Sequence, residues 1–418
     1  MRESCHRRNG SLVRIHPDAM VQRMGFASGS VSFKRFAVLG DAPASVDQNM
    51  LDALSANALR PSEVGVPEEA EYGWSGGRHI LDANFSFDNN VYADALLLGL
   101  RVDSNKVPGD LKKAYQLMEE EAAASTNPSG FISKNQKKDV KDIVRRRVDD
   151  ELRDGRHRRS KLVPILWDLP SQTLYTPAAG KNQELLLEIF ERTFGLSLLP
   201  LSAGSIAMRQ LEPRGKRRDY EDLRPTRFVP GPEGDGQFPE YPWVAKGPEP
   251  KDFLGNEFLL WLWNEADHKG GVVALEGGGD ASVLIDRSLD LDCAYGISGR
   301  DSLRAEGPTR MPEARDALRS GKLPRKAGFV YESAGLQFSF TLNAETFAFG
   351  TVKLPEVEDA ENPRVVFEER IGMLRDLCRS FDALFGTFLK RRASSTWDTE
   401  TTNLRRWIQQ PQKASAAA

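Results

Sequence analysis

The chain has 418 residues, of which 40% are hydrophobic and 28% are charged, and its formal net charge at pH 7 is −3. This composition excludes a wholly disordered chain, and the length predicts two or three packed sub-domains. No apolar run reaches the roughly 18 residues of a membrane-spanning helix, so we expect no membrane partner. Three scattered cysteines, Cys5, Cys293 and Cys378, argue against a disulfide framework or a zinc site and fit a cytoplasmic protein.

The first half of the chain alternates strand and helix patterns. Residues 1–30 are polar and broken by glycines, which predicts a flexible N-terminal extension. Residues 31–205 are predicted to form an α+β domain with a mixed or antiparallel sheet, because strands and helices follow one another on short links. We expect strands at 33–39, 93–102, 162–168, 172–176 and 196–201, and helices at 45–60 (with Ser45 as the N-cap), 111–124, 135–154 and 181–194.

The second half opens after a change in composition. Residues 206–251 are rich in proline and glycine and are predicted to form a linker or a long surface insertion. A second α+β domain is expected over 252–395, and residues 396–418 are expected to form a tail. Within this domain we predict helices at 253–263, 312–320 and 364–392, and strands at 271–276, 282–294, 327–334, 336–343 and 347–354.

The long helix at 364–392 carries an apolar seam with alternating spacings of four and three residues. Such a seam is typical of a helix packed on the sheet of its own domain, or of a partner helix in a dimer. The length of the helix and its single occurrence favour the first interpretation. The seam consists of Phe367, Ile371, Leu374, Cys378, Phe381, Phe385 and Phe388.

Motifs that carry catalysis are scarce in this sequence. It contains no phosphate-binding loop and no nucleophile elbow, its five histidines do not have metal-ligand spacing, and Gly277–Gly279 is expected to be a hairpin turn. Two weak candidates for a metal-dependent nuclease are Glu249-Pro250-Lys251 and the pair Asp290 and Asp292. A proline-rich setting argues against the first, and a half-exposed strand with solvated acids argues against the second. We therefore expect no catalytic residue, no metal site and no cofactor.

Positive charge is concentrated between residues 134 and 161, where twelve lysines and arginines stand against six acidic residues. A narrow apolar stripe in the predicted helix leaves its cations on the remaining surface, and an acid-poor loop follows at 155–161. Duplex DNA carries a charge about every 1.7 Å of its axis, which such a segment can follow. The predicted DNA-binding residues are Lys134, Lys137, Lys138, Lys141, Arg145, Arg146, Arg147, Arg156, Arg158, Arg159 and Lys161, with a second cluster of Lys216, Arg217 and Arg218 in the insertion.

A second interpretation of the basic helix remains open. Its cations could pair with acidic residues three or four positions away and form an ordinary solvated helix surface. The candidate acidic partners are Asp139, Asp142, Asp149 and Asp150.

The order of these features resembles the recombination-associated protein RdgC family of bacteria. The similarity covers residues 33–205 and, more loosely, 253–392. It rests on short motifs: the opening strand Phe33-Lys34-Arg35-Phe36, the pair Gly73-Trp74, the basic helix around Lys137-Lys138, the strand Leu166-Trp167-Asp168, the segment 195–201, and Ala317–Leu323 before paired strands.

This resemblance implies a non-enzymatic protein that forms a ring-shaped homodimer with a positively charged central hole. It also implies binding of double-stranded DNA without sequence preference, association with the nucleoid, and restraint of the RecA recombinase by occupation of its substrate. The family has an apolar finger with a Leu-Pro-Arg-Ala-Phe-like motif after the basic helix, whereas this chain has residues 151–161 without a phenylalanine. We therefore expect phosphate contact here in place of a wedge, and the insertion at 206–250 leaves room for further partners.

Two other functions remain open from the sequence. A protein-interaction scaffold would use the seam from Phe367 to Phe388 and the proline-rich insertion. A metal-dependent nuclease would use the acidic pairs named above. The local excess of positive charge and the scarcity of catalytic motifs favour DNA binding.

Overall fold

The computed structural model describes residues 25–60, 71–128, 130–229, 250–293, 298–357 and 362–410. Within these ranges the protein is a mixed α+β structure built on one 13-stranded sheet. The strand order along the sheet is β10-β9-β11-β12-β13-β1-β6-β5-β4-β2, with β3, β7 and β8 paired at its sides. The strand pairs are antiparallel, as expected for strands on short connections.

The first half of the chain forms one part of this sheet. Successive leucines of β4 point to opposite faces of the sheet, and each face is covered by different helices. Leu96, Leu98 and Leu100 pack in a core with α1 and α5, while Leu97 belongs to the core that contains α10. The elements are β1 (Val31–Leu39), α1 (Gln48–Ala56), β2 (Glu71–Ser75), α2 (Phe87–Asn90), β3 (Val91–Tyr92), β4 (Ala95–Asn105), α3 (Gly109–Ser125), α4 (Lys134–Arg153), β5 (Arg158–Asp168), β6 (Thr173–Thr176), α5 (Lys181–Phe194) and β7 (Ser197–Pro200).

The second half forms the rest of the sheet and the helices that pack on it. Gly277–Gly279 all have positive φ angles in the turn between β8 and β9, which confirms the predicted hairpin. The elements are α6 (Ala203–Leu211), η3 (Glu212–Arg214), α7 (Arg217–Asp222), α8 (Phe253–Lys269), β8 (Val272–Ala274), β9 (Asp280–Cys293), β10 (Asp301–Leu303), η4 (Pro308–Arg310), α9 (Pro312–Arg319), β11 (Lys322–Ser333), β12 (Leu336–Asn343), β13 (Phe349–Lys353), α10 (Pro363–Arg392) and α11 (Trp397–Gln409).

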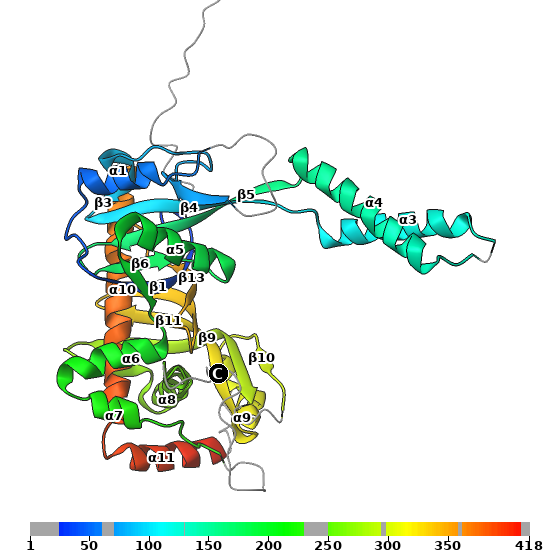
Figure 1. The fold of residues 1–418 in the computed structure, drawn as a ribbon. Coiled ribbons are helices and arrows are strands. Elements are labelled where there is room, and N and C mark those ends of the chain that lie inside the picture. The colour runs from blue at the N-terminus through cyan, green and yellow to red at the C-terminus, as the bar shows by residue number, and fades with distance from the viewer. Residues whose placement is uncertain are drawn as a thin grey trace, which may run out of the picture.

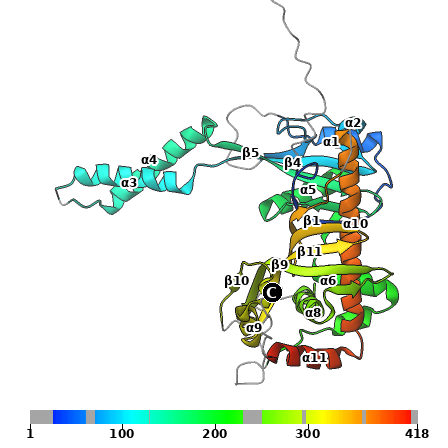
Figure 2. The same cartoon turned by 180° about the vertical axis from the view of Figure 1, so that it is seen from behind.

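Strand β1 and helix α10 join the two halves. β1 pairs with β13 on one side and with β6 on the other, and the rings of Phe33 and Phe349 stack across the joint at 5.1 Å. Helix α10 runs along the body from one half to the other (Figures 1 and 2).

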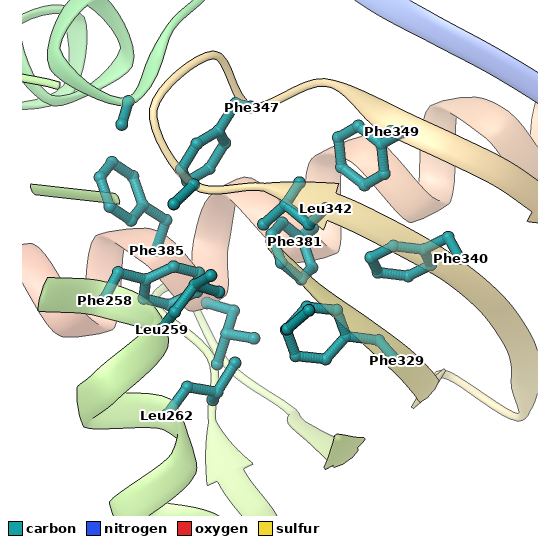
Figure 3. Packing of buried hydrophobic residues seen from close by; sticks show 14 of the residues in the cluster. Phe258, Leu259, Leu262, Phe329, Phe340, Leu342, Phe347, Phe349, Phe381 and Phe385 are labelled. Carbon is teal, nitrogen blue, oxygen red and sulfur yellow. The ribbon is translucent and has the colours of Figure 1, made fainter. Parts of the chain in front are cut away.

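The apolar seam of α10 is buried within its own chain. The ring of Phe381 lies at the centre of an aromatic cluster that includes Phe258, Phe329 and Phe349, with ring centroids 5.5 to 6.2 Å from it (Figure 3). All seven residues of the seam are at most 4% exposed. The packing on its own sheet is therefore confirmed, and the alternative of a partner helix exposed for a dimer or a scaffold is wrong.

Several predicted boundaries need correction. Asp47, and not Ser45, caps α1, and its carboxylate accepts a hydrogen bond of 2.9 Å from the backbone N–H of Met50. The predicted tail contains α11, whose Trp397 and Trp407 are buried. Tertiary packing on the body, which local composition does not encode, orders this helix.

The predicted linker at 206–251 is also partly wrong. Its first part forms α6, η3 and α7, and Tyr220 and Phe228 from this part are buried in the main core. The end of the predicted N-terminal extension contributes Phe26 to the same core. The rest of these predictions, for residues 1–24, 230–249 and 411–418, lies outside the described residues.

Helices α3 and α4 form an arm that projects from the body. Strands β4 and β5 continue past the other strands as a two-stranded ribbon, which ends at the pair Asn105 and Arg158 and carries the two helices away from the sheet (Figures 1 and 2). The arm has a small core of its own, in which Val107, Val148 and Leu152 are buried. Within the described ranges, no helix is both long and apolar enough to cross a bilayer.

Candidate nucleic-acid interface

Helix α4 is well defined at its start and along its packed face. Ser133 and Gln136 form a reciprocal capping box at the N-terminus of α4. The apolar residues Val140, Val144 and Val148 recur every four positions, so they lie on one face, and this face packs toward α3. The position of this face decides where the cations of the helix lie.

Four cations form a row on the exposed surface of α4, which we call the basic stripe: Lys134, Lys138, Lys141 and Arg145. Spacings of four, three and four residues keep side chains on the same face of a helix. All four are exposed, and the ion pairs found among the described residues do not include them. Lys137, also exposed, lies at the edge of the stripe.

The basic stripe has the length of a DNA contact. From Lys134 to Arg145 there are eleven rises of 1.5 Å, or roughly 16 Å of helix, a distance over which duplex DNA presents about ten phosphate charges. Because the arm projects from the body, both of its helices stand clear of the sheet (Figure 1). The stripe is therefore an accessible row of positive charge with the reach to contact several phosphates.

Several other cations of the basic segment have partners within the chain. The guanidinium of Arg146, an exposed residue, donates to the backbone carbonyl of Asp142 at 3.3 Å. Arg153 lies 3.8 Å from Asp150, and Arg156 lies 2.9 Å from Asp154. The guanidinium of Arg147 stacks on the ring of Tyr115 at 3.8 Å. The interpretation as a solvated surface of ion pairs thus fits the C-terminal part of the segment. Arg147 and Arg156 make contacts within the arm, so they are less free than the basic stripe to contact a ligand.

Glu151 organises the base of the arm. Its carboxylate accepts a hydrogen bond of 2.6 Å from the hydroxyl of Tyr115 and lies 2.8 Å from Nε2 of His157. These hydrogen bonds from Tyr115 and His157 lower the pKa of Glu151. The side-chain amide of Asn105 also donates to the carbonyl of Leu152 at 2.7 Å, so side chains fix α4 to the ribbon and to α3.

Residues 158–161 are part of strand β5 and not of a loop, which corrects the sequence prediction. Arg158 donates to both Glu71 and Asp103 at 3.1 Å, so its charge is used inside the protein. Burial alone would raise the pKa of Asp103, but hydrogen bonds from neighbours that include Arg101 and Arg158 lower it. Arg159 and Lys161 are exposed on β5, in the part of the strand that leads from the arm toward the body.

The second predicted cluster does not join the first. Lys216 lies 3.6 Å from Asp219, Arg217 is paired with Glu212 and Glu221, and Arg218 is exposed. Helix α7, which carries this cluster, lies at the end of the body remote from the arm (Figure 1). The structure therefore separates these three residues from the basic stripe, a separation that sequence distance alone did not show.

The apex of the arm presents an aromatic ring that the sequence reasoning missed. Phe131 is 80% exposed between α3 and α4, and the amide of Asn127 donates to its carbonyl at 2.6 Å. The resemblance to the RdgC family implies a finger after the basic helix, whereas the exposed ring precedes that helix. In the sequence, the position of Phe131 between two predicted helices could have indicated an exposed aromatic side chain at the turn.

The candidate nuclease residues are committed to other contacts. Asp290 is buried and pairs with Arg300 and Arg304 at 2.6 and 2.8 Å, in contrast to the solvated acid that was expected. Asp292 pairs with Arg325 at 3.3 Å. The ammonium of Lys251 donates to two backbone carbonyls, and Glu249 lies outside the described residues. No group of three or more metal-ligating side chains occurs in the part of the chain that the structure describes.

The fold and this site define an α+β protein with a projecting, basic helical arm. No protein-family model matches the chain, and no curated protein matches it.

Proposed function

We propose that this protein binds double-stranded DNA without sequence preference, by placing the basic stripe of α4 against the phosphate backbone. The observation that carries the proposal is the exposed row of Lys134, Lys138, Lys141 and Arg145 on a helix that projects from the body. Phosphate contacts of lysine and arginine supply affinity but carry no information about base sequence. The expected activity is therefore binding without a catalytic step.

The resemblance to the RdgC family adds an oligomeric state and a cellular role to this proposal. It supports a homodimer, a ring around the duplex, association with the nucleoid, and limitation of RecA access by occupation of the DNA. The arm would contribute to the cationic surface that faces the duplex. Arg159 and Lys161 on the ribbon would extend that surface toward the body.

Binding measured by fluorescence anisotropy on two duplexes of unrelated sequence tests the proposal. If roughly six phosphates are neutralised, log K should fall with log of the salt concentration with a slope near −5. The double variant Lys138→Gln/Lys141→Gln removes two charges from the stripe. It should weaken binding to both duplexes equally and make the slope shallower by about two.

The same helix supplies a matched control. The double variant Arg146→Gln/Arg153→Gln removes the same charge from a neighbouring face of α4, roughly 90° around the helix from the stripe. Arg153 on that face is already paired with Asp150. This double variant should change the affinity and the slope by less than half as much. Equal losses in the two double variants would reject the stripe as the contact surface, and the absence of binding by the unmodified chain would reject the function.

A further inference from the structure

A cavity of about 400 Å³ lies between α10 and the hairpin of β5 and β6. Helix α10 lies toward the side of the body away from the arm, so the cavity is separate from the basic stripe (Figures 1 and 2). One wall is a single face of α10, because spacings of three and four residues keep side chains together. The residues of this wall are Arg375, Cys378, Arg379 and Asp382.

The strands supply the other wall of the cavity. Arg35 of β1 is paired with Tyr175 of β6, so the two side chains lie on the same face of the sheet. Both line the cavity, together with Thr173 of β6 and Asp168 at the end of β5. Charged and hydroxyl-bearing side chains therefore form much of the lining.

Three arginines lie at different depths in this cavity. The side chain of Arg379 is 77% exposed, that of Arg375 is 23% exposed and that of Arg35 is 3% exposed. Positive charge thus extends from the rim of the cavity to its buried end.

The two carboxylates in the walls are already used inside the protein. Both oxygens of Asp382 accept hydrogen bonds of 2.7 Å from Arg35, and Asp168 accepts from Arg375 and from the hydroxyl of Ser171. Burial raises the pKa of the Cys378 thiol to about 12, so this thiol adds no negative charge at pH 7. Three guanidinium groups against two carboxylates leave the lining with a positive charge.

Guanidinium N–H groups in the lining are left without acceptors in the part of the chain that the structure describes. Nε of Arg35 is buried and has no hydrogen-bond partner there. Nη1 of Arg375 and both Nε and Nη2 of Arg379 likewise donate to no described residue. A guanidinium can only donate, and a buried donor without an acceptor is costly. The lining is therefore short of acceptors, which an anion would supply.

We propose that this cavity binds a small organic anion, whose carboxylate or phosphate group is held by Arg375 and Arg379 and whose body reaches toward Arg35. Arg375 and Arg379 are four positions apart and are neighbours on the helix surface, so they can hold one acidic group together. The planar fork of a guanidinium matches carboxylate and phosphate alike. A volume of about 400 Å³ is more than one inorganic ion fills and lies in the range of sites for small molecules.

Isothermal titration calorimetry of the full chain with citrate and, separately, with glucose 6-phosphate tests this site. At least one of the two should bind with a Kd below about 1 mM, and the tighter of them shows whether carboxylate or phosphate is preferred. The assay contains no DNA, so its result does not depend on the proposed function. If neither compound shows saturable binding below about 1 mM, the proposal is wrong.

Variants locate the bound anion in the cavity. Thr173→Phe fills the cavity from β6 and should abolish binding, and circular dichroism checks that the chain is folded. Arg379→Gln changes an exposed side chain and should weaken binding about tenfold, because a charged donor is lost. Arg153→Gln is the matched control, since Arg153 is also 77% exposed and also lies near an aspartate three residues before it. It should leave the affinity for the anion unchanged.

The basic stripe is the other place where an anion could bind. Lys138→Gln/Lys141→Gln should therefore bind citrate or glucose 6-phosphate as the unmodified chain does. Loss of binding in this double variant, or equal affinities in Arg379→Gln and Arg153→Gln, would overturn the assignment to the cavity.

Discussion

Arg35 and Asp382 connect β1 to α10 through two hydrogen bonds of 2.7 Å each. Arg35 is 3% exposed, so the carboxylate of Asp382 compensates a positive charge that solvent does not reach. Removing one member of a buried ion pair leaves the other charge without compensation, whereas replacing both with apolar residues is often close to neutral. The pair thus holds the long helix in place against the strand that joins the two halves.

Asp382→Ala is therefore expected to lower the free energy of unfolding by about 3 kcal/mol. The double variant Arg35→Met/Asp382→Leu should recover most of this loss, because it leaves no unpaired charge. Urea denaturation followed by circular dichroism measures both values. If the double variant is less stable than Asp382→Ala, the loss in Asp382→Ala does not come mainly from leaving the charge of Arg35 unpaired.

At the scale of elements, the arm depends on the ionised state of Glu151. A carboxyl group with a lowered pKa in the folded state stabilises that state at pH values above its ordinary pKa. The contribution is lost as the pH falls through the lowered value, because the unfolded chain then binds the proton more readily. Hydrogen bonds from Tyr115 and His157 give Glu151 such a lowered pKa.

We accordingly expect the amides of α4 to exchange about tenfold faster in Glu151→Gln than in the unmodified chain at pH 7. This difference should shrink as the pH falls below the ordinary pKa of a glutamate and through the lowered pKa of Glu151, because the carboxyl group then becomes protonated in the folded chain as well. Hydrogen exchange read by mass spectrometry, corrected for the intrinsic rate at each pH, separates α4 from the body. Strands β11 and β12 serve as the internal control, since exchange there should not change. A difference that is constant with pH would contradict the role of the charge.

At the scale of the whole molecule, the body and the arm have separate cores. The two large cores of the body contain no residue of α3 or α4, and the arm meets the body through the ribbon of β4 and β5. Residues that do not share packing usually contribute independently to stability. The body is therefore expected to fold without the arm.

Replacing residues 106–157 with Asn-Gly should close the ribbon as a hairpin, because Asn105 and Arg158 already pair at its end. The stability of the body should change by less than about 1 kcal/mol, while DNA affinity should fall by about a hundredfold or more. Urea denaturation and fluorescence anisotropy measure the two effects. A folded body that keeps full DNA affinity would place the interface elsewhere.

Local periodicity made part of this structure predictable. The valine stripe of α4 and the phenylalanine seam of α10 are patterns of three and four residues, and both helices begin and end within one or two residues of the predicted positions. The concentration of cations between 134 and 161 was likewise visible in the sequence. The spacing of Lys134, Lys138, Lys141 and Arg145 could have identified the stripe within it.

The tertiary structure decided what depends on residues far apart in the chain. Residues 158–161 are a strand because β4 pairs with them, and α11 is ordered because Trp407 packs against Trp263, 144 positions earlier. Strand pairing and packing are contacts between distant segments, so the local pattern that predicts a helix cannot show whether that helix lies on the body or projects from it. The sequence determined which residues could bind a polyanion and that four of them share one face of a helix, and the pairing of β4 with β5 determined that this helix projects from the body on an arm.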